Sequence, residues 1–199
     1  MRRAIAALSR PASDHDDMIS TPRLRLVRWQ EEHRAPFAQM HADQEVMHDL
    51  GGPIRRSESD VKFARYIEAY ATHGISRWAV EATDGRFLGY AGVMPRLFPD
   101  HPLGSHFEVG WRFTRSAWGN GYATESAQAA LRDAFLRKSL DEILSYTSVE
   151  NLRSQAVMTR LGLRRDPSRD FTVGSWRGLV WIASRACSGK PLHGLGKTR

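Results

Sequence analysis

The segment from residue 107 to residue 126 constrains the fold more than any other part of this chain. It begins with FEVGWRF, where bulky apolar residues alternate with Glu108, Gly110 and Arg112 as in a β-strand. It then passes through Trp-Gly-Asn-Gly at 118–121 into alanine-rich sequence with helical spacing. The first N–H groups of a helix have no intrahelical partner and favour an anion. The sequence therefore predicts a strand, a glycine turn and a helix, with an anion site at the turn.

Two familiar phosphate-binding patterns do not fit this turn. A P-loop requires the spacing GxxxxGK[ST], which occurs nowhere in the chain. The dinucleotide fingerprint GxGxxG would need a third glycine at the position of Thr124. Gly-Asn-Gly by itself is equally compatible with an ordinary turn between a strand and a helix.

Gly110 extends the candidate site into the strand. Glycine inside a run of bulky strand residues typically marks a β-bulge or a close backbone approach. A bulge would release backbone N–H groups from the ladder and direct them at a ligand. The unit would then offer strand N–H groups followed by phosphate-binding N–H groups. This suits a ligand with an amide-bearing arm and a pyrophosphate, as coenzyme A has.

The remaining pattern predicts a mixed sheet flanked by helices, in the α/β to α+β range. Expected strands cover 23–29, 76–82, 86–94, 142–149 and 177–185, with a hairpin at Asp84-Gly85 whose two turn residues would both need positive φ. Expected helices cover 31–50 in two pieces, 123–135, and 151–162 with Asn151 as N-cap. Another helix should follow a capping box at Ser57 and Asp60, with apolar residues at helical spacing: Val61, Ala64, Ile67 and Ala71. Residues 95–104 are expected to form a loop.

Length and charge limit the domain organisation. A chain of 199 residues favours one domain, expected over 21–185, between a disordered leader at 1–20 and a basic, disordered tail at 186–199. Met18 is an alternative start. Of the net charge of +7, residues 164–199 carry +6 and residues 23–163 only +1. The basic excess lies toward the tail, which disfavours a nucleic-acid-binding body.

Membrane and metal functions are also disfavoured. No apolar run approaches the roughly 18 residues that span a membrane. The single cysteine, Cys187, cannot form an internal disulfide, which fits the reducing cytoplasm. The eight histidines show no paired spacing of the kind that metal sites use.

Four motifs resemble the GNAT superfamily of N-acetyltransferases. The family's cofactor motif is Gln/Arg-x-x-Gly-x-Gly/Ala at a helix start, and Trp118–Ala123 matches it with Trp118 in place of the first residue. TPRLRLVRW, FEVGWRF, the tryptophan with GYATE, and NLRSQAVMTRLG look like the ribosomal-protein-alanine N-acetyltransferase branch, in the same order. The resemblance covers roughly residues 20–170.

The resemblance implies a fold and a cofactor site. The expected fold is a strongly bent, mixed sheet of about six to seven strands, splayed between its fourth and fifth strands where acetyl-CoA lodges. The backbone of Val109, Gly110 and Trp111 would hold the pantetheine and polarise the thioester carbonyl. Asn151 and Ser154 would lie near the thioester. The turn would hold the pyrophosphate through these residues: Trp118, Gly119, Asn120, Gly121, Tyr122, Ala123 and Thr124.

The expected reaction is direct transfer to an amine in a ternary complex. The acceptor would be a protein N-terminus or a small molecule, and the protein a monomer or homodimer. A lysine amine near pKa 10.4 is harder to deprotonate than an α-amine near 7.8, so a low-pKa amine is the easier acceptor. Glu108 is the candidate base, through a water, or a merely solvated strand residue. Ser154 could protonate the leaving thiolate or simply sit in a first helical turn, and Asn151 could act only as an N-cap.

Two other functions stay open. An acyl-CoA-binding module without catalysis would use the same fold, and a nucleotide-binding protein would use the same turn. After DPSRDF, relatives continue with a longer substrate-lining hairpin, whereas residues 172–199 here are short, basic and unfamiliar. This departure puts the acceptor side of the site in question.

Overall fold

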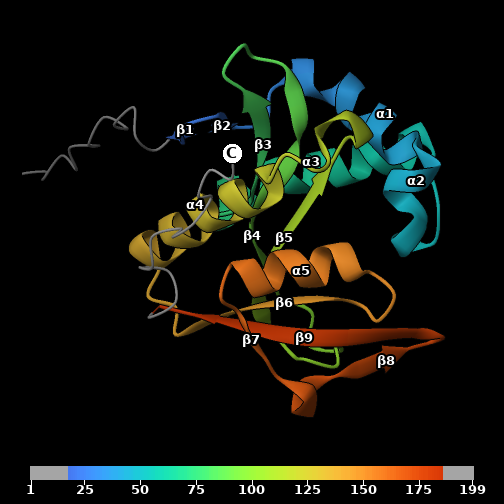
Figure 1. Cartoon of the computed structure of the whole chain (residues 1–199), viewed down its shortest axis with the longest axis vertical. Helices are drawn as coiled ribbons and strands as arrows, with labels where there is room; N and C mark the ends of the chain where they lie inside the picture. The colour runs from blue at the N-terminus through green and yellow to red at the C-terminus, as the bar shows by residue number, and fades with distance from the viewer. Residues whose placement is uncertain (1–17, 186–199) are drawn as a thin grey trace, which may run out of the picture.

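A computed structural model describes residues 18–185, which form one nine-stranded sheet with helices on both faces (Figure 1). The strands run in the order β1-β2-β3-β4-β5-β6-β9-β7, and β8 pairs with β9. All pairings are antiparallel except that of β5 with β6. The strand bounds are β1 Met18–Ser20, β2 Leu24–Val27, β3 Arg77–Ala82, β4 Phe87–Arg96, β5 His106–Phe113, β6 Glu142–Ser148, β7 Arg164–Arg165, β8 Phe171–Val173 and β9 Trp176–Ser184.

Five α-helices cover the sheet: α1 Arg34–Ala42, α2 Gln44–Met47, α3 Arg56–His73, α4 Tyr122–Arg137 and α5 Leu152–Arg160. Helices α1 and α3 bury Phe37, Phe63 and Tyr66 against Tyr90 and Met94 of β4. On the other face of β4, the alanine-rich side of α4 packs on strands β2 to β5. Helix α5 joins α4 over β5, β6 and β9 in a second cluster. The sheet is thus the middle of three layers.

The sheet is splayed between β5 and β6. Strand β5 pairs with β4 along all eight of its residues, whereas within the described chain its parallel pairing with β6 is recorded at Glu108 and Leu144 alone. Figure 1 shows the two parts, with β6, β9, β7 and β8 in the lower half, β1, β2 and β3 in the upper half, and β4 running down behind β6. This confirms the expected mixed, bent sheet, although three short strands (β1, β7 and β8) raise the strand count above six or seven.

Most predicted elements are confirmed, but the predicted boundary between the leader and the folded domain is not. The sequence places residues 18–20 in a disordered leader, yet they form β1 and pair with β2 from Met18–Val27 to Ser20–Arg25. The rest of the predicted leader and the whole tail at 186–199, with Cys187, lie outside the described residues.

Helix α3 differs from its prediction at its start and on its buried face. It begins at Arg56, and Glu58 rather than Asp60 caps it by accepting a hydrogen bond from the Arg55 N–H at 2.9 Å. The predicted stripe faces solvent, with Val61 exposed by 71% and Ile67 by 44%. The helix instead buries Phe63 and Tyr66, whose rings carry more apolar area than the aliphatic stripe.

Three local turn predictions are also corrected. Gly85 has a positive φ of 86°, but Asp84 does not, so the β3–β4 hairpin uses a longer turn closed by Gly85 N–H to the Ala82 carbonyl. Strand β4 extends through Arg96 into the predicted loop. No bulge occurs at Gly110, which pairs in register with Gly92; the register shift lies at Val80/Glu81 instead.

The unfamiliar C-terminal segment is a regular part of the sheet as far as residue 184. Phe171–Val173 and Trp176–Ser184 form the β8–β9 hairpin, and β9 lies between β6 and β7. Strand β9 buries Val180 to Ala183, and β6 pairs with β9 along the whole length of β6. The predicted departure from related sequences therefore does not interrupt this fold.

Candidate active site

The glycine turn has the geometry of an anion site. Gly119 and Gly121 both adopt φ of 77°, which favours glycine over any other residue. The Glu125 N–H makes the first backbone hydrogen bond of α4, to the Gly121 carbonyl at 3.1 Å. The six N–H groups of residues 119–124 therefore have no acceptor within residues 18–185. The Thr124 hydroxyl is also buried without a partner, so the turn fits a ligand with several acceptor oxygens.

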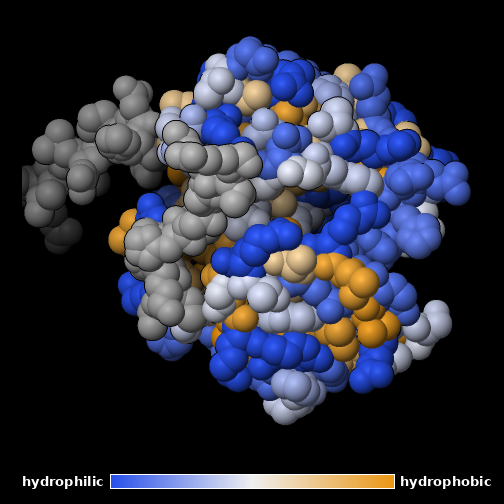
Figure 2. Space-filling model, viewed as in Figure 1, coloured by the Kyte–Doolittle hydropathy of each residue, from blue (hydrophilic) through white to orange (hydrophobic). Residues whose placement is uncertain are grey.

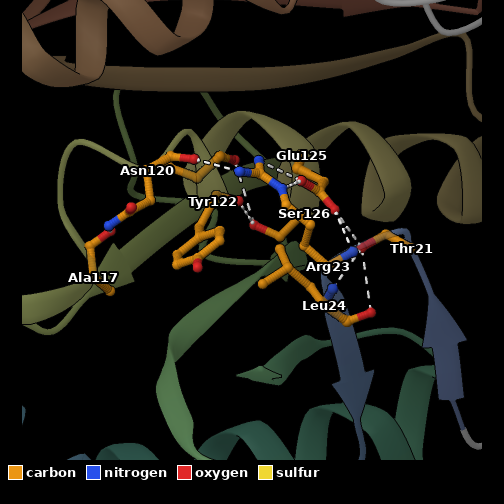
Figure 3. A network of polar contacts seen from close by, with 9 residues as sticks. Thr21, Arg23, Leu24, Ala117, Asn120, Tyr122, Glu125 and Ser126 are labelled. Carbon is orange, nitrogen blue, oxygen red and sulfur yellow. Dashed lines mark hydrogen bonds and ion pairs between the residues drawn. The ribbon is translucent and has the colours of Figure 1, made fainter. Parts of the chain in front are cut away.

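An ion-pair network holds this turn in place (Figure 3). The Glu125 carboxylate accepts hydrogen bonds from Thr21 Oγ1 at 2.7 Å and from Arg23 Nε at 2.7 Å. Arg23 Nη1 donates to the Asn120 carbonyl at 2.9 Å. The Asn120 side chain closes the turn by donating to the Trp118 carbonyl at 3.0 Å. The motifs TPRL and GYATE, distant in sequence, thus meet at one point.

A hydrogen bond holds the Trp118 side chain beside the turn, and a guanidinium group lies over its ring. Its Nε1 donates to the Phe113 carbonyl at 3.0 Å. The Arg153 guanidinium of α5 lies 4.1 Å from its ring centroid. A positive charge therefore stands next to the position where the family motif has its basic or amide residue.

The β6-facing edge of β5 supplies a second set of backbone groups. The Val109 carbonyl accepts a hydrogen bond from Ser145 Oγ of β6 at 3.0 Å, so the backbone of Val109 points toward β6. Residues two apart in a strand present their backbone groups to the same edge, which places those of Trp111 there too. Beyond Glu108 the two strands diverge, so this edge opens into the splay.

Gly110 leaves room for a neighbouring side chain and does not form the predicted bulge. Its neighbours are Gly92 on β4 and the Arg77 guanidinium, and a Cβ at this position would lie 2.6 Å from Arg77 Nη2. The missing side chain makes room for Arg77 and not for a bulge. The splay between β5 and β6, and not a bulge, is what opens this strand edge.

A cleft of about 270 Å³ lies between the two parts of the sheet. Figure 2 shows the molecule hollowed at this level, with hydrophilic residues along much of the rim. It brings together six predicted residues: Glu108, Val109, Gly110, Trp111, Asn151 and Ser154. The turn residues 118–124 do not line it, so the predicted site consists of two regions, the cleft and the turn.

Glu108 is buried and fully paired. It is 7% exposed, and its oxygens accept from Arg77 Nη2 at 2.8 Å and Arg96 Nε at 2.5 Å. Burial raises the pKa of Glu108, whereas Arg77 and Arg96 lower it. Together the two arginines outweigh burial, so the pKa lies below its ordinary value. This carboxylate is therefore ionised near neutral pH, and it is not the solvated strand glutamate of the simpler interpretation.

Asn151 and Ser154 lie at the start of α5, facing the cleft. Asn151 is the N-cap, as predicted, and its Oδ1 accepts from the Ser154 N–H at 2.9 Å. The Ser154 hydroxyl lines the cleft and has no hydrogen-bond partner within the described chain. It is free to bind a substrate atom.

Sequence reasoning missed several cleft residues. Arg77 lies on β3 and Arg96 at the end of β4, and Tyr146 and Trp176 enter from the lower part of the sheet. One signal was present: Arg77 and Glu81 are charged residues in a strand whose every residue is buried. Buried charges need partners, so charged residues inside the apolar strand pattern SRWAVEA indicate ion pairs with neighbouring elements.

One cluster of potential metal ligands occurs in the described chain, formed by Glu32, His33 and Glu81. Both ring nitrogens of His33 are engaged, because Nδ1 accepts from the Gln30 N–H at 3.0 Å and Nε2 contacts Glu81 Oε1 at 2.8 Å. A metal would have to displace one of these bonds. Among residues 18–185, no helix combines the length and apolar character that crossing a bilayer requires.

Comparisons with known proteins agree with this geometry. Residues 23–164 match the family described as acetyltransferase (GNAT) domain. FsC-acetyl coenzyme A-N(2)-transacetylase of Aspergillus fumigatus is 32% identical over 152 residues, covering 73% of this chain and 64% of that protein. The chain thus aligns with slightly less than two thirds of that relative's length.

Solved structures show the same fold at low identity. The acetyltransferase of Agrobacterium tumefaciens superposes with a TM-score of 0.74 at 24% identity, covering 92% of this chain and all of that one. Mycobacterium smegmatis RimJ in complex with CoA-disulfide gives a TM-score of 0.66 at 19% identity, covering 85% of each chain. With a family match over most of its length, this chain belongs to the acetyltransferase (GNAT) domain family.

Proposed function

We propose that this protein transfers the acetyl group of acetyl-CoA directly to the nitrogen of an amine. The observation that carries the proposal, within the described chain, is the combination of unpaired backbone N–H groups at residues 119–124 with the edge of β5, which parts from β6 beyond Glu108. Acetyl-CoA needs both, because its pyrophosphate is anionic and its pantetheine arm carries amides. Family membership and the CoA-bound RimJ structure of the same fold support this assignment.

The turn and the strand edge bind different parts of acetyl-CoA. The N–H groups of 119–124 hold the pyrophosphate, with the helix dipole of α4 and the cation of Arg153 nearby. The backbone edge at Val109 and Trp111 holds the pantetheine arm and directs donors at the thioester carbonyl. Such donors each lower the barrier to an acyl transfer by roughly 3 kcal/mol.

The remaining chemistry falls to the cleft. A neutral amine attacks the thioester carbonyl and forms the C–N bond, the C–S bond breaks, and the nitrogen loses its extra proton to water. The Ser154 hydroxyl donates a hydrogen bond to the departing thiolate, or protonates it and regains a proton from water. An α-amine near pKa 7.8 is the easier nucleophile, since only about 1 kcal/mol is needed to deprotonate it at neutral pH.

Glu108 fits a positioning role better than that of a general base. A carboxylate that two arginines hold ionised has little tendency to take a further proton. We assign it the task of fixing Arg77 and Arg96 in the cleft. The alternative role, proton removal through a water, predicts a different kinetic effect of Glu108→Gln.

The test is release of free thiol from acetyl-CoA in the presence of a panel of amines, including peptides with alanine or serine at the N-terminus. We expect release with at least one class of amine, and Ser154→Ala should lower kcat by roughly a hundredfold, the low end of general acid–base effects. Acetyl-CoA at a hundredfold excess over Kd should stabilise the protein by about 2.7 kcal/mol. Gly121→Val should remove that stabilisation, because φ of 77° disfavours a branched side chain.

Two results would replace the proposal. Tight acetyl-CoA binding without transfer to any amine would indicate an acyl-CoA-binding module. Stabilisation by ATP or NAD but not by acetyl-CoA would indicate a nucleotide-binding protein.

A further inference from the structure

The cleft is lined by more positive charges than its carboxylates balance. Five cationic side chains line the cleft but only two carboxylates, those of Asp49 and Glu108. Arg77 and Arg96 are the partners of Glu108. Three cations are left over, Lys62 and Arg65 on α3 and Arg112 on β5.

These three residues have no acidic partner in the part of the chain that the structure describes. Arg112 Nη1 contacts the thioether of Met47, a weak acceptor. Arg65 lies 5.9 Å from the ring centroid of Tyr66. The Nε atoms of Arg65 and Arg112 are buried and lack any hydrogen-bond partner. No salt bridge of Lys62 is formed within residues 18–185.

The titration of nearby groups reports the same positive potential. Burial lowers the pKa of Lys62, Tyr90 opposes this shift, and Arg112, Arg65 and Arg77 each lower the pKa further. Burial raises the pKa of Tyr90, yet Arg112, Arg77 and Lys62 bring it down to about 8. Burial together with Arg112 and Lys62 lowers the pKa of His41 to about 3. Arg112, which has no acidic partner in the described chain, contributes to all three shifts.

Acetyl-CoA does not account for this charge. In the proposed complex its pyrophosphate lies at the turn at 119–124, which does not line the cleft, and the pantetheine arm and acetyl group that enter the cleft are neutral. The second substrate remains as the source of a compensating negative charge. The cations line the same cleft as Ser154 and the open edge of β5, so an acceptor in the cleft would contact both.

We propose that Lys62, Arg65 and Arg112 form an anion subsite that binds a carboxylate or phosphate group of the acceptor amine. The inference rests on the proposed function, since it identifies the second substrate of that reaction as an anionic amine. Tyr66 and Tyr90 lie among the three cations, and their rings are 5.5 Å apart. Paired hydrogen bonds from guanidinium groups are the protein's usual means of recognising such anions.

The kinetic test compares acceptors that differ only in charge. β-Alanine is paired with its amide, and O-phosphoethanolamine with ethanolamine, so that the carboxylate and phosphate cases are separated. We expect kcat/KM to be at least about tenfold higher for the anionic member of one pair. Arg112→Gln and Lys62→Met should remove most of that preference by raising KM, with little change for the neutral member. Arg86→Gln, on the distant and exposed β3–β4 turn, is the matched control and should change neither.

A binding experiment keeps the subsite testable if transfer fails. N-acetyl-β-alanine and its amide have no amine to acetylate, and Trp176 in the cleft gives a fluorescence signal. Tighter binding of the anion, weakened by Arg112→Gln but not by Arg86→Gln, would support the subsite even in a protein that transfers nothing. Equal binding of both compounds would overturn it. So would a preference for succinyl-CoA over acetyl-CoA without discrimination among acceptors, because the cations would then serve the acyl group.

Discussion

Glu108 and Arg77 form a buried ion pair whose two charges depend on each other. Their side chains are 9% and 7% exposed, and the two groups meet at 2.8 Å. Removing one partner of such a pair leaves the other charged and unpaired. We therefore expect Glu108→Gln to lower the free energy of unfolding by about 3 kcal/mol, measured by urea denaturation at pH 7. Asp84→Asn removes an exposed acid near Arg86 and should cost almost nothing.

The pH dependence of stability follows from the lowered pKa of Glu108. A carboxyl whose folded pKa lies below its unfolded value contributes stability above the unfolded pKa, near 4.3. That stability is lost as the pH falls through the folded pKa. The wild type should therefore lose more stability than Glu108→Gln between neutral pH and acid. The catalytic alternative differs: if Glu108 were the base, the folded variant would lose kcat at every pH while retaining substrate affinity.

At the scale of elements, the glycine turn depends on a contact with the N-terminal segment. Glu125 accepts from Thr21 Oγ1, the Arg23 N–H and the Arg23 guanidinium, and Arg23 in turn binds the Asn120 carbonyl. Glu125→Gln should cost about 1–2 kcal/mol of stability, since Arg23 is partly exposed and solvent screens the pair. It should also weaken acetyl-CoA binding, because the turn loses its support.

A matched variant separates these effects from a general loss of charge. Glu68 is exposed on α3, far from the turn in sequence, and Glu68→Gln should leave acetyl-CoA affinity unchanged. Wild-type affinity in Glu125→Gln, measured by calorimetry, would show that the turn holds its shape without this network.

Local sequence patterns predicted the elements better than their contacts. The glycine turn, the N-cap at Asn151 and the strand at 142–149 depend on residues that are neighbours in sequence, and all three are confirmed. Helix α3 was predicted with the wrong face, because Val61 and Ile67 repeat at helical spacing just as Phe63 and Tyr66 do. Only the tertiary packing on Tyr90 decides between the two stripes.

The sequence predicted the backbone groups of the candidate site but not the charged side chains of the cleft. Positive φ at glycine and free N–H groups at a helix start are local properties that the motif encodes. Arg77, Arg112 and Lys62 come from three elements, so their meeting in the cleft follows from strand pairing and helix packing. The spacing of these residues in the sequence does not predict that they meet. The bulge predicted at Gly110 is absent for the same reason, since the close neighbour of this glycine is a side chain from β3.

At the scale of the whole molecule, the sheet has two parts that diverge from one register pair, Glu108 and Leu144. If acetyl-CoA occupies both the turn and the splay, it should protect amides in two separate stretches at once. Backbone N–H groups without an acceptor exchange readily with solvent, which applies to residues 119–124, and the β6-facing edge of β5 beyond Glu108 has no strand paired to it within the described chain. We expect acetyl-CoA to slow hydrogen exchange in peptides covering 107–113 and 119–124 together.

The comparison with a shorter ligand makes this prediction specific. A nucleotide that lacks the pantetheine arm, such as ADP, should protect residues 119–124 and leave 107–113 as fast as in the free protein. The β3–β4 hairpin at 82–87 serves as the internal reference, because it lies outside both regions and should respond to neither ligand. Protection of the turn by acetyl-CoA without any change at 107–113 would contradict the placement of the pantetheine on β5, and it would leave the splay without a ligand.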